Sequence, residues 1–195
     1  RLQPLQGLSV HVPRSAIGKE GAKPHLADHA GRTRCRPDAQ HACQLVQRVT
    51  TVTSAAVVAA KRILKYLKGT LEAGIEYSPE QEQAFRKEYT EILRMSKPGA
   101  ELPDNVLFTD SDFAGCVVTF YSTSGVALYR RGTPLAWSAK RQTIRAHSTT
   151  EAEYIAVHDG IVIKEQLGYM EWLLETESVP TTIFVDNQST IKLSQ

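Results

Sequence analysis

The stretch VLFTD at residues 106–110 decides the fold class, because it is a mostly apolar run that ends at an aspartate. Such a run is typical of a buried strand. Two further strands are expected at residues 124–129 and 134–138, with the glycine of their turn within 130–133. A long helical pattern then covers about 148–175, followed by a strand at 182–186 and the start of a helix at 188–193. This order predicts an α/β fold with helices packed on a mixed sheet.

The chain before residue 105 is less regular. Residues 1–44 show no helix or strand period and are expected to be loop. A helix is expected at about 54–68, with four cations on its polar face: Lys61, Arg62, Lys65 and Lys68. Residues 74–77 indicate a short strand, and residues 80–102 a surface helix or a linker. We therefore divide the chain into an irregular leader (1–35), a connecting segment with linker (36–104) and an α/β domain (105–195).

Composition excludes several classes of protein. The 195 residues are 42% hydrophobic, which argues against full-length disorder, and no apolar run is long enough to span a membrane. Three scattered cysteines favour a reducing compartment, so an intracellular protein, cytoplasmic or nuclear, without a membrane partner is expected. Residues 1–60 hold eight basic and three acidic side chains, whereas residues 61–195 hold 15 and 18. The basic leading part suits either a nucleic-acid backbone or plain solvent.

Three acidic residues occupy positions where the chain changes direction. Asp110 ends the first strand, Glu151 lies in the first turn of the long helix, and Asp186 ends the last strand. If the two strands are parallel neighbours, both aspartates lie at the same sheet edge, and Glu151 can reach it from the helix. Carboxylates that close repel one another unless a cation lies among them, and Mg²⁺ prefers oxygen ligands. The pattern predicts metal-assisted phosphodiester chemistry.

Each acid also has a purely structural interpretation. Ser148-x-x-Glu151 and Thr150-x-x-Glu153 are both capping boxes, and on spacing alone Glu151 fits a cap better than a metal ligand. Asp186 can begin a turn or helix, and Asp110 can simply face water. An aspartic protease is excluded because Asp110-Ser111 is followed by Asp112 and not by glycine. A structural α/β domain remains the alternative if the acids lie apart.

Four motifs resemble the ribonuclease H domain of copia-type retrotransposon Pol polyproteins. They are FTDSDFAG (108–115), STSGVALYRRGTPLAWSAKRQT (122–143), STTEAEYIAV (148–157) and IFVDNQSTIKL (183–193). Upstream, RPDAQHACQLVQ (36–47), AAKRILKYLKGT (59–70) and GIEYSP (74–79) resemble the segment that joins reverse transcriptase to that domain. The order and spacing of these motifs cover most of residues 36–195.

The resemblance implies an RNase H-like mixed sheet flanked by helices. It implies Mg²⁺-dependent (or Mn²⁺-dependent) cleavage of the RNA strand of an RNA–DNA hybrid, together with a reverse transcriptase domain in the parent polyprotein. The acids that match the motifs are Asp110, Glu151 and Asp186, with Asp112 and Glu153 secondary. Candidate substrate-binding residues are Ser124, Lys140, Asn187 and Gln188.

This sequence departs from the family pattern at its end and in one loop. No acid follows Asp186, so the family's fourth acidic ligand is missing from the sequence, and we expect a C-terminally truncated domain. Thr119, Phe120 and Tyr121 stand where the family carries basic residues. A catalytically inactive remnant, which binds nucleic acid weakly at most, therefore stays open as the alternative to an active enzyme.

Overall fold

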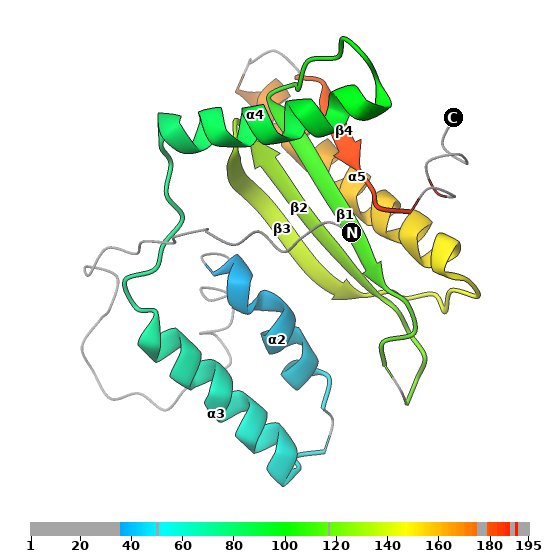
Figure 1. Ribbon diagram of the computed structural model, residues 1–195. Coiled ribbons are helices and arrows are strands. Elements are labelled where there is room, and N and C mark those ends of the chain that lie inside the picture. The colour runs from blue at the N-terminus through cyan, green and yellow to red at the C-terminus, as the bar shows by residue number, and fades with distance from the viewer. Residues whose placement is uncertain (1–35, 50, 117, 175–178, 188–189, 191–195) are drawn as a thin grey trace. The chain divides into compact units, whose positions relative to one another are not determined.

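The computed structural model describes residues 36–49, 51–116, 118–174, 179–187 and 190 (Figure 1). They fall into two compact units, one ending at Glu76 and one beginning at Tyr77. Among the described helices, none is both long enough and apolar enough to cross a membrane. The predicted irregular leader at 1–35 and most of the predicted helix at 188–193 lie outside the described residues.

The second unit is built on a four-stranded mixed sheet, which confirms the predicted α/β fold. Its strands are β1 (Asn105–Asp112), β2 (Thr123–Arg130), β3 (Thr133–Arg141) and β4 (Thr181–Phe184). They lie in the order β3-β2-β1-β4, with β1 parallel to β4 and the other pairs antiparallel (Figure 1). The turn between β2 and β3 contains Gly132 at φ +78°, a left-handed conformation that glycine adopts without steric cost.

Alternate side chains of β1 point to opposite faces of the sheet, and a helix covers each face. Val106 and Phe108 pack in one cluster with aromatic residues of α4 (Pro79–Ser96). Leu107 packs in the other cluster with Ile163 and Leu167 of α5 (Thr149–Leu173). The sheet thus lies between α4 and α5 (Figure 1).

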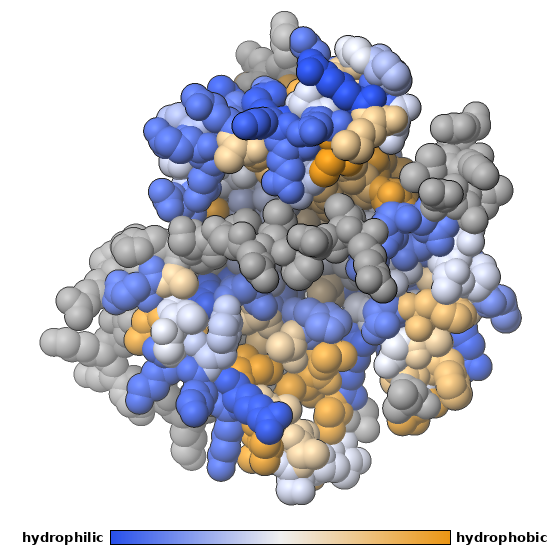
Figure 2. All heavy atoms as spheres, in the orientation of Figure 1, coloured by the Kyte–Doolittle hydropathy of each residue, from blue (hydrophilic) through white to orange (hydrophobic). Residues whose placement is uncertain are grey.

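Helix α4 is part of this unit, although the sequence analysis assigned residues 80–102 to the segment before the domain. The Ser78 hydroxyl caps its start by accepting the Gln81 N–H, and Pro79 stands at its first position. Its inner face carries Phe85 and Tyr89, whose ring centroids lie 4.5 Å apart. These rings join aromatic side chains of β1, β2 and β4: Phe108, Tyr129 and Phe184. In Figure 2 the visible outer side of α4 is strongly hydrophilic.

The long helix expected at about 148–175 is continuous in the structure, since α5 runs across both Gly160 and Gly168. The apolar run at residues 183–185 predicts a buried central strand, and this prediction needs correction. Among the described strands β4 is instead at the edge of the sheet, and the Ile183 side chain is 37% exposed. The other prediction of burial, for residues 106–108, is confirmed at Val106 and Leu107, which are both fully buried.

The first unit contains α2 (Pro37–Gln47) and α3 (Ser54–Gly69), which pack against each other. The expectation of loop through residue 44 was therefore wrong for 37–44. Arg36 ties the two helices together, because it pairs with Asp38 of α2 and donates to the carbonyl and hydroxyl of Thr70 after α3. Asp38 also accepts the Tyr66 hydroxyl at 2.6 Å. The short strand expected at 74–77 is absent; those residues form loop.

Candidate metal centre

The parallel pairing of β1 and β4 places two aspartates side by side. Phe108 pairs with Phe184, so Asp110 and Asp186, each two residues further on, are level at the carboxyl ends of neighbouring strands. Neighbouring strands lie about 4.8 Å apart. The condition for a shared site, that the two strands are parallel neighbours, is therefore met. Both aspartates are exposed at this edge.

Helix α5 brings a third carboxylate to the same edge. Ala152, Ala156 and Gly160 recur every four residues and are buried, which defines the side of α5 that faces the sheet. The helix comes so close at Gly160 that an added Cβ would lie 2.8 Å from Thr109 Cγ2. Glu153 lies on this side of the first turns and is only 6% exposed. Its carboxylate therefore lies against the end of β1.

Asp110, Glu153 and Asp186 form a cluster in which one carboxylate oxygen from each lies within 4.8 Å of the others. Ser111 orients Glu153, because its N–H and hydroxyl both donate to Oε1, the hydroxyl at 2.8 Å. The other oxygen, Oε2, is buried and has no hydrogen-bond partner among the described residues. Burial raises the pKa of Glu153, and the negative charges of Asp110 and Asp186 raise it further, while the hydrogen bond from Ser111 lowers it.

This geometry corrects the assignment of the second acid: the structure places Glu153, and not Glu151, with the two aspartates. Glu151 caps the start of α5, since its carboxylate accepts the His147 N–H at 2.7 Å and its own N–H donates to the Ser148 hydroxyl. It lines a separate open pocket of about 420 Å³ with Ser148, Thr150 and Tyr154. The capping interpretation of Glu151 is thus the one that the contacts support.

The other predicted residues lie in different settings. Ser124 is 1% exposed, and its hydroxyl accepts Nε2–H of buried Gln142, so it faces the interior and not a substrate. Lys140 pairs with Ser124 across β2 and β3 and is exposed. Asn187 is half-buried beside Asp186, and its Oδ1 accepts the Thr190 N–H. Gln188 lies outside the described residues, and Asp112 is not part of the carboxylate cluster.

Sequence reasoning missed a basic and aromatic cluster near this edge. The guanidinium groups of Arg141 and Arg145 lie 5.0 and 5.6 Å from the ring centroid of Tyr121, within cation–π distance. Neither arginine forms an ion pair with the described residues. Arg141 pairs with Thr123, which pairs with Asp112, so its backbone is two strand spacings, about 10 Å, from the end of β1.

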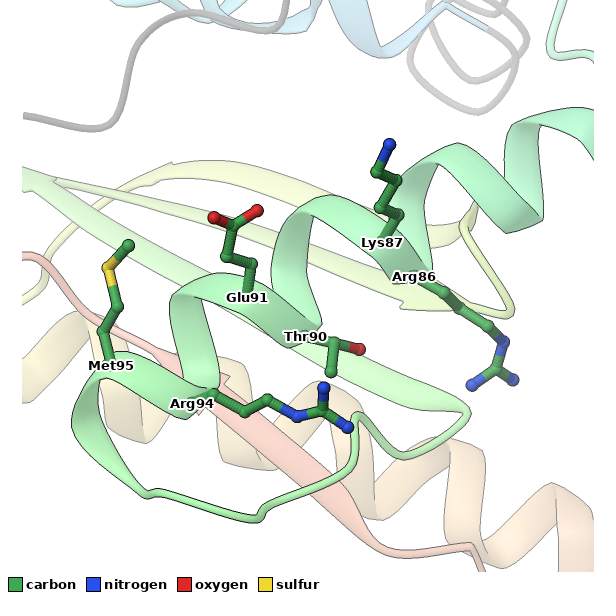
Figure 3. Close-up of a pocket in the computed structure, with 6 residues that line it drawn as sticks. All are labelled: Arg86, Lys87, Thr90, Glu91, Arg94 and Met95. Atoms are coloured by element: carbon green, nitrogen blue, oxygen red, sulfur yellow. The ribbon is translucent and has the colours of Figure 1, made fainter.

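A larger pocket, of about 780 Å³, lies along α4 and contains none of the clustered acids. In Figure 3 Arg86 and Arg94 extend to one side of α4, with Thr90 between them. Both arginines already have partners within the protein: Arg86 pairs with Glu82 and Asp104, and Arg94 donates to the Ala100 carbonyl. The pocket therefore lies over contacts that fasten α4 to the loop after it. The larger pocket is therefore not the site of the clustered acids.

The chain is similar in sequence to proteins of retrotransposon origin. It is 35% identical over 126 residues to the uncharacterized mitochondrial protein AtMg00810 of Arabidopsis thaliana, covering 64% of this chain and 44% of that protein. It is 31% identical over 160 residues to the retrovirus-related Pol polyprotein from transposon RE1 of Arabidopsis thaliana, covering 78% of this chain and 9% of the polyprotein. The corresponding polyprotein from transposon TNT 1-94 of Nicotiana tabacum is 29% identical over 163 residues, covering 82% and 10%. These similarities support a retrotransposon Pol-derived protein.

The chain spans less than half of the first of these relatives and about a tenth of the polyproteins. No family model matches it. No solved structure matches it significantly.

The donor set of the cluster fits a hard divalent cation. Three carboxylates within 4.8 Å supply only oxygen ligands, the type that Mg²⁺ and Mn²⁺ prefer. The unpartnered Oε2 of Glu153 is a buried acceptor that a cation would satisfy. Asp110 and Asp186, both exposed, leave the outer side of the cluster open to water and to a substrate.

Proposed function

We propose that the chain carries an RNase H-like domain of a retrotransposon Pol polyprotein, which cleaves the RNA strand of RNA–DNA hybrids. The observation that carries the proposal is the cluster of Asp110, Glu153 and Asp186, in which the buried Glu153 carboxylate keeps one oxygen without a hydrogen-bond partner among the described residues. Mg²⁺, or Mn²⁺, is the proposed cofactor. When bound, such an ion activates a water molecule and stabilises the charge on the leaving oxygen.

The residues of the chain have separate parts in this proposal. Asp110 and Asp186, exposed on neighbouring strands, face the substrate side, while Ser111 holds Glu153 in position. The reaction is attack of water on an RNA phosphodiester with in-line displacement of the ribose oxygen. On the β3 side of the carboxylate cluster, cations are supplied by Arg141, Arg145 and the exposed Lys140. They would contact phosphates next to the one that is cleaved.

The proposed partners follow from the same chemistry. The substrate is an RNA–DNA hybrid, in which the 2′-hydroxyl distinguishes the strand to be cut. A reverse transcriptase domain of the parent polyprotein would make that hybrid, within the cell.

The test is cleavage of a hybrid labelled on its RNA strand, with DNA and RNA duplexes of the same sequence as controls. The expected result is cleavage of the hybrid alone, dependent on Mg²⁺ or Mn²⁺ and lost in Glu153→Gln. Glu151→Gln is the matched control, because it removes a neighbouring carboxylate outside the cluster. Cleavage that survives Glu153→Gln and is lost in Glu151→Gln would refute the site. Folded protein without metal-dependent cleavage would instead support the inactive remnant.

A further inference from the structure

Helix α3 of the first unit carries a cationic face that the proposed nuclease site does not use. Its four basic side chains are exposed, and no acidic residue occurs between Thr53 and Leu71. No ion pair joins these cations to any described residue. The four residues are Lys61, Arg62, Lys65 and Lys68, named here the α3 basic face.

The packing of α3 orients this face away from α2. The less exposed positions of α3 recur at helical spacing and form its inner side: Ala56, Ala59, Ala60, Ile63 and Leu67. At 100° per residue, Lys61, Lys65 and Lys68 lie on the opposite side of the helix. Because α2 packs on α3, and because Arg36 and Tyr66 fasten the two helices together, the basic face stays on the outside of this pair. In Figure 2 strongly hydrophilic side chains gather over the region of α2 and α3, beside hydrophobic ones.

The spacing of these cations suits a phosphodiester backbone. Lys61, Lys65 and Lys68 follow one another along the helix at rises of about 6 and 4.5 Å. A nucleic-acid strand presents one negative charge per about 3.4 Å of duplex axis, so a row of this density can contact phosphates along one strand. Unpaired exposed cations lose no internal ion pair when they bind, and the released counterions drive association.

We infer that the α3 basic face binds the phosphate backbone of a nucleic-acid duplex, independently of base sequence. The α3 basic face lies in a different unit from the carboxylate cluster. Binding there does not require the cluster to be catalytically active. The choice of an RNA–DNA hybrid as the probe rests on the proposed function; the binding itself does not. Exposed Val57 and Val58 continue the same side of α3, so an anionic lipid surface is the competing partner that the test must separate.

The experiment measures fluorescence anisotropy of a labelled RNA–DNA hybrid with the whole chain in EDTA, from 50 to 300 mM salt. The triple variant Lys61→Gln, Lys65→Gln, Lys68→Gln removes three cations, and glutamine keeps the helix propensity of lysine. The slope of log K against log [salt] should fall in magnitude by about 2.7, and affinity at 0.1 M salt by about 10²–10³-fold. The matched control Lys87→Gln, Lys97→Gln, Lys164→Gln has the same net charge and should bind nearly as the parent does.

Each outcome decides the matter. Equal losses in both triple variants would show a net-charge effect and overturn the inference. Loss of binding to phosphatidylserine vesicles, with hybrid binding unchanged, would assign α3 to a lipid surface instead. Because binding is measured without metal, the two proposals can fail separately. A chain that binds through α3 but does not cleave would contradict the proposed function and support this inference. A chain that cleaves, and whose triple variant binds as the parent does, would contradict this inference and leave the proposed function standing.

Discussion

Replacing Glu153 by glutamine should stabilise the protein in the absence of metal. The substitution removes the most buried charge of the cluster and keeps Oε1 as the acceptor for the two Ser111 donors. A site that selection has shaped for binding a cation is expected to cost stability when the cation is removed.

The magnitude follows from the distances. Two unit charges 4.8 Å apart repel by about 0.9 kcal/mol at the dielectric constant of water and by about 3.5 kcal/mol at an effective value of 20. Asp110 and Asp186 are exposed, so solvent screening places each pair near the lower figure. Two such pairs give a gain of about 2 kcal/mol for Glu153→Gln at pH 7, equivalent to about 4–8 °C in Tm.

The gain should also depend on pH. Because the pKa of Glu153 is raised on folding, the folded protein holds this proton to a higher pH than the unfolded chain does. The parent therefore loses stability as pH rises from about 4.3, the ordinary glutamate pKa, through the raised value. The variant has no such loss at this position, so its stability advantage over the parent should be near zero below pH 4 and larger at pH 7.

Urea denaturation in EDTA at pH 4 and pH 7 measures this difference. The control Glu151→Gln removes a carboxylate from the first turn of α5, where the helix dipole favours it, and should destabilise by about 0.3–1 kcal/mol at pH 7. A Glu153→Gln variant that is less stable than the parent at pH 7, or equally shifted at both pH values, would refute the reasoning.

Three further predictions concern the support of the site. Gly160→Ala should destabilise by about 1–3 kcal/mol in urea, because its Cβ would lie 2.8 Å from a Thr109 methyl group; an unchanged midpoint would contradict this close approach. Gln142→Ala should cost about 1–3 kcal/mol, since buried Nε2 donates to the Ser124 hydroxyl and the Ala152 carbonyl; a neutral effect would show that water replaces it. Polar groups of Thr119 lower the pKa of the Cys116 thiol to about 7, so iodoacetamide labelling of its peptide should have a midpoint near pH 7; a midpoint near the ordinary thiol value of about 8.5 would contradict this.

Much of the fold was readable from the sequence, because strand runs and turn residues are local signals. The level position of Asp110 and Asp186 was predicted only on the condition that their strands are parallel neighbours, and the pairing of β1 with β4 meets that condition. Helix α4 was also visible in principle, since Phe85, Tyr89 and Leu93 recur every four residues. Its high charge content instead favoured a surface helix or a linker in the sequence analysis.

The error at Glu151 has a physical reason. Both Glu151 and Glu153 complete capping boxes, and spacing from a capping residue does not tell which side of the helix faces the sheet. The stripe of small residues at Ala152, Ala156 and Gly160 does tell, and Glu153 lies beside it while Glu151 does not. Ser124 shares its strand face with Val126 and Leu128, so a period of two already indicated burial.

The cluster of Tyr121, Arg141 and Arg145 could not be predicted in the same way. Its members come from the loop before β2, the end of β3 and the loop before α5. Only the tertiary fold brings them together.

Binding of Mn²⁺, measured by electron paramagnetic resonance, reports on the three clustered acids without substrate or activity. The parent and Glu151→Gln should bind Mn²⁺ alike, and Mg²⁺ should compete. Glu153→Gln and Asp110→Asn should each weaken binding by at least about tenfold, a loss of about 1.4 kcal/mol. Binding that Glu151→Gln abolishes and Glu153→Gln leaves unchanged would contradict the assignment of Asp110, Glu153 and Asp186 as the metal centre.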